Sequence, residues 1–153
     1  MNNIISMETK MPVHQLIYVS LAQKKMLKSD LYIILRKARK NNEHSDVTGL
    51  LIYSDEYFIQ VLEGKKEVVK NLFKKISEDT RHSDIQILEE RETSERAFLN
   101  WKMAYSTPSL RDLANWSGLK NATNINQVMK GLQQNTSHLS GILTSALKNQ
   151  THI

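Results

Sequence analysis

The chain has 153 residues, a length that suits one compact domain with short additions. Its 40% apolar and 24% charged residues exclude disordered, collagenous and low-complexity proteins, and the absence of cysteine excludes disulfide frameworks, thiolate metal sites and a cysteine nucleophile. The formal net charge of +5 comes from lysines and arginines separated by acids, a pattern that is typical of a solvated surface and also permits an anionic ligand.

The first part of the chain contains short apolar runs and one amphipathic run. Residues 14–20 (HQLIYVS) predict a strand, and a Ser-Asp cap followed by apolar residues at helical spacing predicts a helix over 29–41. Residues 47–54 and 57–64 are apolar almost throughout and are joined by two residues. They therefore predict an antiparallel hairpin that is buried on both faces.

The second part begins with an amphipathic run that predicts a helix over 65–79. Residues 84–93 alternate between apolar and polar in the manner of a strand, and a further short strand is expected over 101–106. After Pro108 the composition shifts toward Asn, Ser, Gln and Leu. Weak helical periodicity follows in three segments, 109–116, 124–134 and 138–148.

The order of these elements is a split βαβ arrangement. It predicts an α+β fold of the ferredoxin-like type, βαββαββ, with a mixed sheet and both helices on one face. We expect the tail to form a helical pair that covers the free sheet face or contacts a partner. The expected organisation is a flexible extension over 1–12, a sheet domain over 13–106 and a C-terminal helical extension over 107–153.

No apolar run is long enough for a secretory signal or a membrane span. We therefore expect a cytoplasmic protein without membrane contact.

The most informative polar residue is Gln60, which lies among apolar residues on a predicted central strand. A buried amide without a partner costs about 1–3 kcal/mol, so Gln60 needs polar neighbours. One interpretation is that it pairs with nearby backbone while Tyr18 packs as an ordinary core aromatic. The other is a planar ligand rich in heteroatoms, held between the two helices by the amides of Asn41, Asn42 and Gln60.

Other classes of site have weaker support. The five histidines never occur at i, i+4 spacing with acidic partners on one helix, which argues against a metal centre. The glutamates of residues 89–95 lie in a polar stretch, which is more typical of a solvated edge than of paired acid–base catalysis. His82, beside Arg81 and close to Asp79, is expected either in an exposed turn or in contact with an anionic group.

Several motifs together resemble those of BLUF domains, which are blue-light sensor modules that bind flavin. They are LIYVS (16–20), KNN-x5-TGLL-x-Y (40–53), FIQVLEG (58–64), EDTRH (78–82) and NWKM (100–103). The similarity extends in order from about residue 13 to 106. The resemblance implies a ferredoxin-like core with flavin between the two helices: FAD physiologically, with FMN or riboflavin as alternatives in recombinant protein.

Carried over by position, the resemblance implies that Tyr18 is the photoactive tyrosine and that Gln60 links it to the flavin. Asn42 would hold the C4 carbonyl and N3 region of the ring. Trp101 and Met103 match a switch segment in which one or the other lies near Gln60. Further expected flavin-binding residues are Asn41, Phe58, Asp79, Arg81 and His82.

The resemblance also implies a mode of action. Light would rearrange the hydrogen bonds among Tyr18, Gln60 and the flavin, and the change would pass through the last strand to the C-terminal helices. No output-domain signature follows residue 106, so we expect a short-type photoreceptor that is not itself an enzyme. A homo-oligomer and a light-dependent protein partner are expected.

Two alternatives from other classes remain open at this point. A ferredoxin-like single-stranded RNA-binding module could use Tyr18 and Phe58 on its sheet, but the cluster of basic, glycine and aromatic residues typical of such modules is missing. A small phosphatase-like enzyme would need a phosphate cradle, and residues 20–28 offer lysines without glycine.

Overall fold

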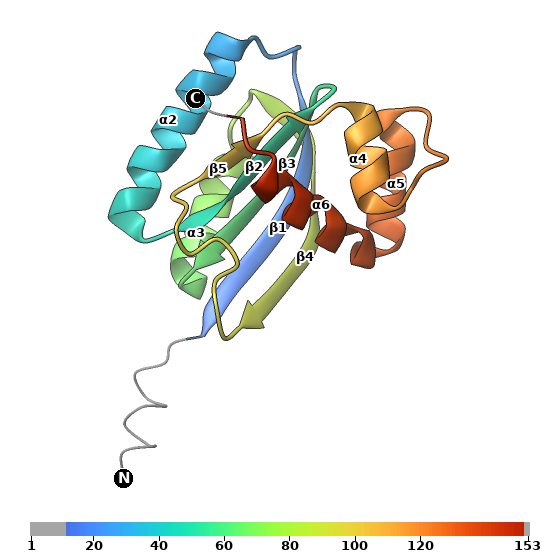
Figure 1. The fold of residues 1–153 in the computed structure, drawn as a ribbon. Coiled ribbons are helices and arrows are strands. Elements are labelled where there is room, and N and C mark those ends of the chain that lie inside the picture. Colours follow the sequence, from blue (N-terminus) through green and yellow to red (C-terminus); the bar gives the residue numbers. More distant parts are fainter. Residues whose placement is uncertain (1–11, 152–153) are drawn as a thin grey trace.

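The computed structural model describes residues 12–151 (Figure 1). The flexible extension expected at the N-terminus lies outside the described residues except for Pro12. The sheet domain consists of β1 (Val13–Ala22), α2 (Lys28–Ser45), β2 (Thr48–Ser54), β3 (Tyr57–Gly64), α3 (Lys66–Ser77), β4 (His82–Thr93) and β5 (Ala104–Ser106). The tail consists of α4 (Leu110–Ser117), α5 (Ile125–Gln134), the 3-10 helix η1 (Thr136–His138) and α6 (Leu139–Lys148).

The five strands form one mixed sheet in the order β4-β1-β3-β2-β5. Neighbouring strands are antiparallel except for β2 and β5, which are parallel. The order of strands and helices predicted from the sequence is confirmed for all seven elements of the sheet domain. In the register of β1 and β3, Tyr18 lies directly opposite Gln60, so the two polar residues of the predicted site are cross-strand partners.

Helices cover both faces of the sheet (Figure 1). Side chains of a strand point to alternate faces, and β3 shows this clearly. Phe58 and Leu62 pack with residues of α2 and α3, whereas Ile59 and Val61 pack with residues of α4, α5 and α6. The tail therefore covers the free sheet face, as expected, but it does so with three α-helices rather than a pair.

Most predicted boundaries differ from the observed ones by a few residues, and two of the differences have a clear physical reason. The first helix does not stop at the Asn41-Asn42 break, because the Asn42 side chain is buried and donates to the carbonyl oxygen of Lys102 at 2.6 Å. That tertiary contact outweighs the low helix propensity of asparagine. The helix ends instead at Ser45 and is capped by Asp46, which has a left-handed φ of 56°. The strand expected over 101–106 is shorter, since regular pairing with β2 begins only at Ala104.

Within residues 12–151, no helix combines the length and the apolar character needed to cross a bilayer.

Candidate functional site

A cavity of about 270 Å³ lies between the sheet and helices α2 and α3. Its apolar walls include side chains from α2, α3 and the central strands. The eight residues expected to bind flavin all line it: Tyr18, Asn41, Asn42, Phe58, Gln60, Asp79, Arg81 and His82. Residues up to 64 positions apart in the sequence are thus brought together around one space by the split βαβ topology.

Tyr18 and Gln60 form the polar centre of the cavity wall. The Tyr18 hydroxyl donates a hydrogen bond to Gln60 Oε1, and both side chains are buried. The Tyr18 ring packs edge-on against Phe73, with ring centroids 5.4 Å apart. Burial raises the pKa of Tyr18 above its ordinary value, and the nearby charge of Asp79 adds to this effect. Tyr18 is therefore a neutral phenol with its proton directed at the amide oxygen.

Gln60 also contacts the segment that precedes β5. Its Nε2 lies 3.7 Å from the sulfur of Met103, which is 1% exposed, whereas Trp101 is 40% exposed. The sequence left open which of these two residues faces Gln60, and in the structure it is Met103. A thioether is only a weak acceptor, so the Gln60 amide N–H groups retain the capacity to donate to a stronger acceptor in the cavity.

Asn42, near the end of α2, supplies a second buried amide to the cavity. Its Nδ2 is engaged by the carbonyl of Lys102, which leaves the amide oxygen to accept a hydrogen bond. Asn41 lines the same cavity but is exposed. Together with Gln60, these side chains offer both donors and acceptors, as the edge of a planar heterocycle requires.

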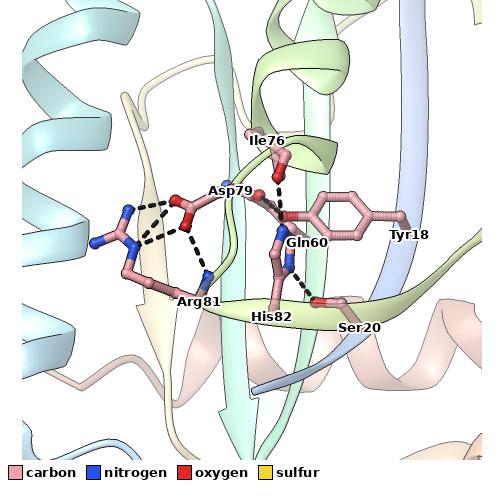
Figure 2. A network of polar contacts seen from close by, with 7 residues as sticks. All are labelled: Tyr18, Ser20, Gln60, Ile76, Asp79, Arg81 and His82. Atoms are coloured by element: carbon pink, nitrogen blue, oxygen red, sulfur yellow. Dashed lines mark hydrogen bonds and ion pairs between the residues drawn. The ribbon is translucent and has the colours of Figure 1, made fainter. Parts of the chain in front are cut away.

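An ion pair forms part of the cavity rim (Figure 2). The Arg81 Nε donates to both carboxylate oxygens of Asp79 at 3.0 Å, and the Arg81 backbone N–H donates to the same carboxylate at 2.9 Å. Hydrogen bonds from the Arg81 side chain lower the pKa of Asp79 to about 2. Both residues belong to the short connection between α3 and β4, so the pair shapes this turn.

His82 has both ring nitrogens engaged (Figure 2). Nε2 lies 2.6 Å from the carbonyl oxygen of Ile76, and Nδ1 lies 2.8 Å from the Ser20 hydroxyl. A carbonyl can only accept, so Nε2 carries the hydrogen. His82 thus ties α3, β1 and β4 together, and it contributes shape to the cavity.

Sequence reasoning missed two cations of the cavity. Lys37 and Lys75 line the space together with Arg81. Their helical spacing from lining residues, three residues after Ile34 in one helix and three after Leu72 in the other, was the signal that could have located them. Both lysines are exposed, so the cavity has a cationic mouth and an amide-lined interior.

These features fit the flavin of FAD. The two helices supply apolar walls for a flat ring, the amides supply partners for its polar edge, and the cations suit attached phosphates. Among residues 12–151, no cluster of three or more His, Asp or Glu side chains could hold a metal ion.

Comparisons with known proteins agree with this geometry. Residues 13–104, more than half of the chain, match the model of the family described as BLUF, sensors of blue-light using FAD. A photoactivated adenylate cyclase subunit beta of Euglena longa is 35% identical over 96 residues, which are 62% of this chain and 11% of that protein. The chain therefore spans about a tenth of the length of this relative.

Two solved structures match nearly the whole chain. The structure titled BlsA ground state has 32% sequence identity and a TM-score of 0.79, with coverage of 92% of this chain and 91% of that one. The BlsA photo-activated state has the same identity and a TM-score of 0.78, with coverage of 92% and 99%. The ferredoxin-like α+β fold is thus confirmed. By its fold, its cavity and its sequence match, the chain belongs to the BLUF family of blue-light sensors, and its cofactor is FAD.

Proposed function

We propose that the chain is a photoreceptor in which blue light rearranges the hydrogen bonds of Tyr18 and Gln60 beside FAD. The change then reaches a partner protein through Met103, β5 and the C-terminal helices. One observation carries the proposal: a continuous buried contact from the Tyr18 hydroxyl through the Gln60 amide to the Met103 sulfur.

In this proposal, each residue has a separate task. Asn41 and Asn42 bind the polar edge of the ring, and Arg81 with the two cavity lysines attracts the phosphates. Ile34 and Leu72 pack against the flat ring and exclude water.

Bound FAD supplies a chromophore that absorbs blue light and, when excited, strongly attracts an electron from a nearby phenol. A phenol that has lost an electron is a much stronger acid than the neutral phenol. The Tyr18 proton therefore moves along its existing hydrogen bond to Gln60 Oε1. When the electron and the proton have both returned to Tyr18, the Gln60 amide would be left rotated or tautomerised. Rotation changes no covalent bond, whereas tautomerisation moves one hydrogen from the amide nitrogen to its oxygen. Either change alters the hydrogen-bond pattern of Gln60 toward the ring and Met103.

A route from Met103 to the tail is available in the contacts of β5. The Thr151 backbone N–H donates to the Tyr105 carbonyl at 2.8 Å, and the Ser106 hydroxyl donates to the Asn149 carbonyl at 3.1 Å. Movement of Met103 would therefore displace the strand to which the end of α6 is bound. This supports a division into a sensor over 13–106 and an output segment over 107–153.

We further propose that output occurs by contact rather than by catalysis, in the cytoplasm, from a homo-oligomer that binds a separate partner. The Euglena relative carries cyclase in its name, but the match covers only about a tenth of that protein. The RNA-binding alternative is not favoured, because Tyr18 and Phe58 are buried beneath α2 and α3 and cannot stack on bases.

The test is the absorption spectrum of the FAD-loaded chain before and after blue light. The proposal predicts a small red shift of the visible bands that reverses in the dark. Gln60→Leu should bind FAD but show no shift, whereas Gln86→Leu, which removes an exposed amide on β4, should respond normally. A wild-type protein that contains FAD and shows no reversible shift would overturn the proposal.

A further inference from the structure

Glu63 is a carboxylate that is 0% exposed, near the end of β3. It lies three residues after Gln60 and therefore on the opposite face of the sheet, the one covered by the tail. Both carboxylate oxygens accept two hydrogen bonds each. The donors are Thr48 Oγ1 at 3.0 Å and the Phe98 N–H at 2.7 Å on one oxygen, and Gln15 Nε2 at 3.2 Å and the Ala97 N–H at 2.9 Å on the other.

Two of these donors belong to the connection between β4 and β5. The N–H groups of Ala97 and Phe98 donate to Glu63 and not to a strand, whereas the Trp101 carbonyl of the same connection accepts from the Gly49 N–H of β2 at 3.2 Å. Arg96 closes this cluster from outside: its guanidinium donates to Thr48 Oγ1 at 3.1 Å and to Asp46 at 3.2 Å. All four hydrogen bonds to Glu63 end on its buried carboxylate. This carboxylate holds the backbone of Ala97 and Phe98 rigidly, because release of either N–H would leave a buried polar group unpaired.

The other end of the same segment is attached to the cavity wall. Asn42 donates to the Lys102 carbonyl at 2.6 Å, and Arg39 Nε donates to the Met103 carbonyl at 3.1 Å. The Met103 sulfur meets Gln60 Nε2 at 3.7 Å. The segment over 97–103 therefore has one end held by Glu63 on the tail side and one end in contact with the residues proposed to sense light.

We infer that Glu63 is a positioning residue of the photoresponse: it is the fixed anchor about which the segment over 97–103 moves. The inference rests on the proposed function. With one end fixed, a change at Gln60 cannot be absorbed by sliding of the whole segment, so the displacement of Met103 is directed into β5. The same anchor keeps Met103 in contact with Gln60 in the dark. This contact favours return of the Gln60 amide to the orientation in which it accepts the Tyr18 hydrogen bond.

The test compares Glu63→Gln with Thr48→Val in the FAD-loaded chain. Glu63→Gln keeps the size of the side chain but turns an NH2 group toward a backbone N–H donor of Ala97 or Phe98. Thr48→Val removes a donor from the same carboxylate, together with the contact of Arg96 with Thr48, but leaves both backbone hydrogen bonds to Glu63 in place. For Glu63→Gln we expect a normal red shift, since Tyr18 and Gln60 are intact, and recovery in the dark slowed about tenfold. Thr48→Val should recover within about twofold of wild type.

Amide hydrogen exchange of the unmodified protein provides a second readout that does not depend on how well a variant folds. The N–H groups of Ala97 and Phe98 should be protected equally in the dark and under light, while those of residues 101–104 should change. Recovery of Glu63→Gln at the wild-type rate, or light-dependent exchange at Ala97 and Phe98, would overturn the anchor even though the wild type shows its red shift. Absence of that red shift would instead refute the proposed function.

Discussion

The two faces of the sheet are built from alternate residues of the same strands, yet they differ in kind. On the tail side, Ile59 and Val61 of β3 enter an apolar core that also includes Leu132 of α5. On the side of α2 and α3, Tyr18 and Gln60 border a cavity of about 270 Å³. The core under the tail is closed by apolar side chains, whereas the cavity under α2 and α3 is bordered by a buried phenol and buried amides.

This difference teaches how a small domain can combine stability with a responsive site. Apolar area buried on the tail side contributes about 25 cal/mol per Å² without directional requirements. Polar groups in the cavity contribute little net stability, but each needs a specific hydrogen-bond partner. When one hydrogen bond changes, the neighbouring polar groups must therefore change their hydrogen bonds as well. Both faces carry a buried apolar core that stabilises the fold, and the cavity face adds the polar groups that can respond to a ligand.

Tyr18→Phe should have the largest effect on the cavity face. Removal of the hydroxyl abolishes the light-induced red shift, because no proton remains to move to Gln60. The free energy of unfolding should change by only about 1 kcal/mol, the net worth of one buried hydrogen bond. The matched control is Tyr105→Phe, a buried tyrosine of β5 that does not line the cavity. A red shift that persists in Tyr18→Phe would remove Tyr18 from the mechanism.

Leu132→Ala should have the largest effect on the tail face. Leu132 is fully buried, so truncation should lower the free energy of unfolding by about 2–5 kcal/mol in urea denaturation. Ile34→Ala, in the half-buried wall of the cavity, should cost about 1 kcal/mol because less area is lost and the side chain already borders open space. Equal losses for the two variants would contradict the division of roles between the faces.

Gly141→Ala should produce a smaller effect on the same face. A methyl group at this position of α6 would lie 2.0 Å from the carbonyl oxygen of Trp116, so α6 must shift away from α4. We expect a loss of about 1–3 kcal/mol, typical of overpacking. Ser140→Ala, on the exposed side of the same helix, is the control and should be close to neutral. Denaturation midpoints that do not distinguish the two variants would show that α6 tolerates displacement.

The smallest effect is expected from the Asp79–Arg81 pair at the cavity rim. The pKa of Asp79 is lowered to about 2 from its ordinary value near 4, so the pair stabilises the folded state above pH 4. That contribution falls as the pH drops from 4 to 2. Since the pair is partly exposed, we expect Asp79→Asn to cost less than about 1 kcal/mol at pH 7. The difference in free energy of unfolding between Asp79→Asn and the wild type should shrink below pH 4. A difference that grows below pH 4 would contradict the lowered pKa of Asp79.

Much of this arrangement could be predicted from periodicity. Alternation in the strands and helical spacing identified the elements, and the apolar surroundings of Gln60 identified it as a buried amide that needs partners. The position of Met103 could not be predicted, because residues 101–103 follow no regular strand and are held by side chains of α2 and by Gln60. The anchor at Glu63 was also missed, since its main partners are backbone N–H groups, which every residue except proline carries.

The most direct test of the central claim is a light-minus-dark infrared difference spectrum of the FAD-loaded chain with isotope-labelled glutamine side chains. Among the residues that line the cavity, Gln60 is the sole glutamine. The account predicts carboxamide bands that shift with the label and decay at the same rate as the red shift. A protein whose visible spectrum shifts reversibly while no glutamine band responds to the label would contradict it.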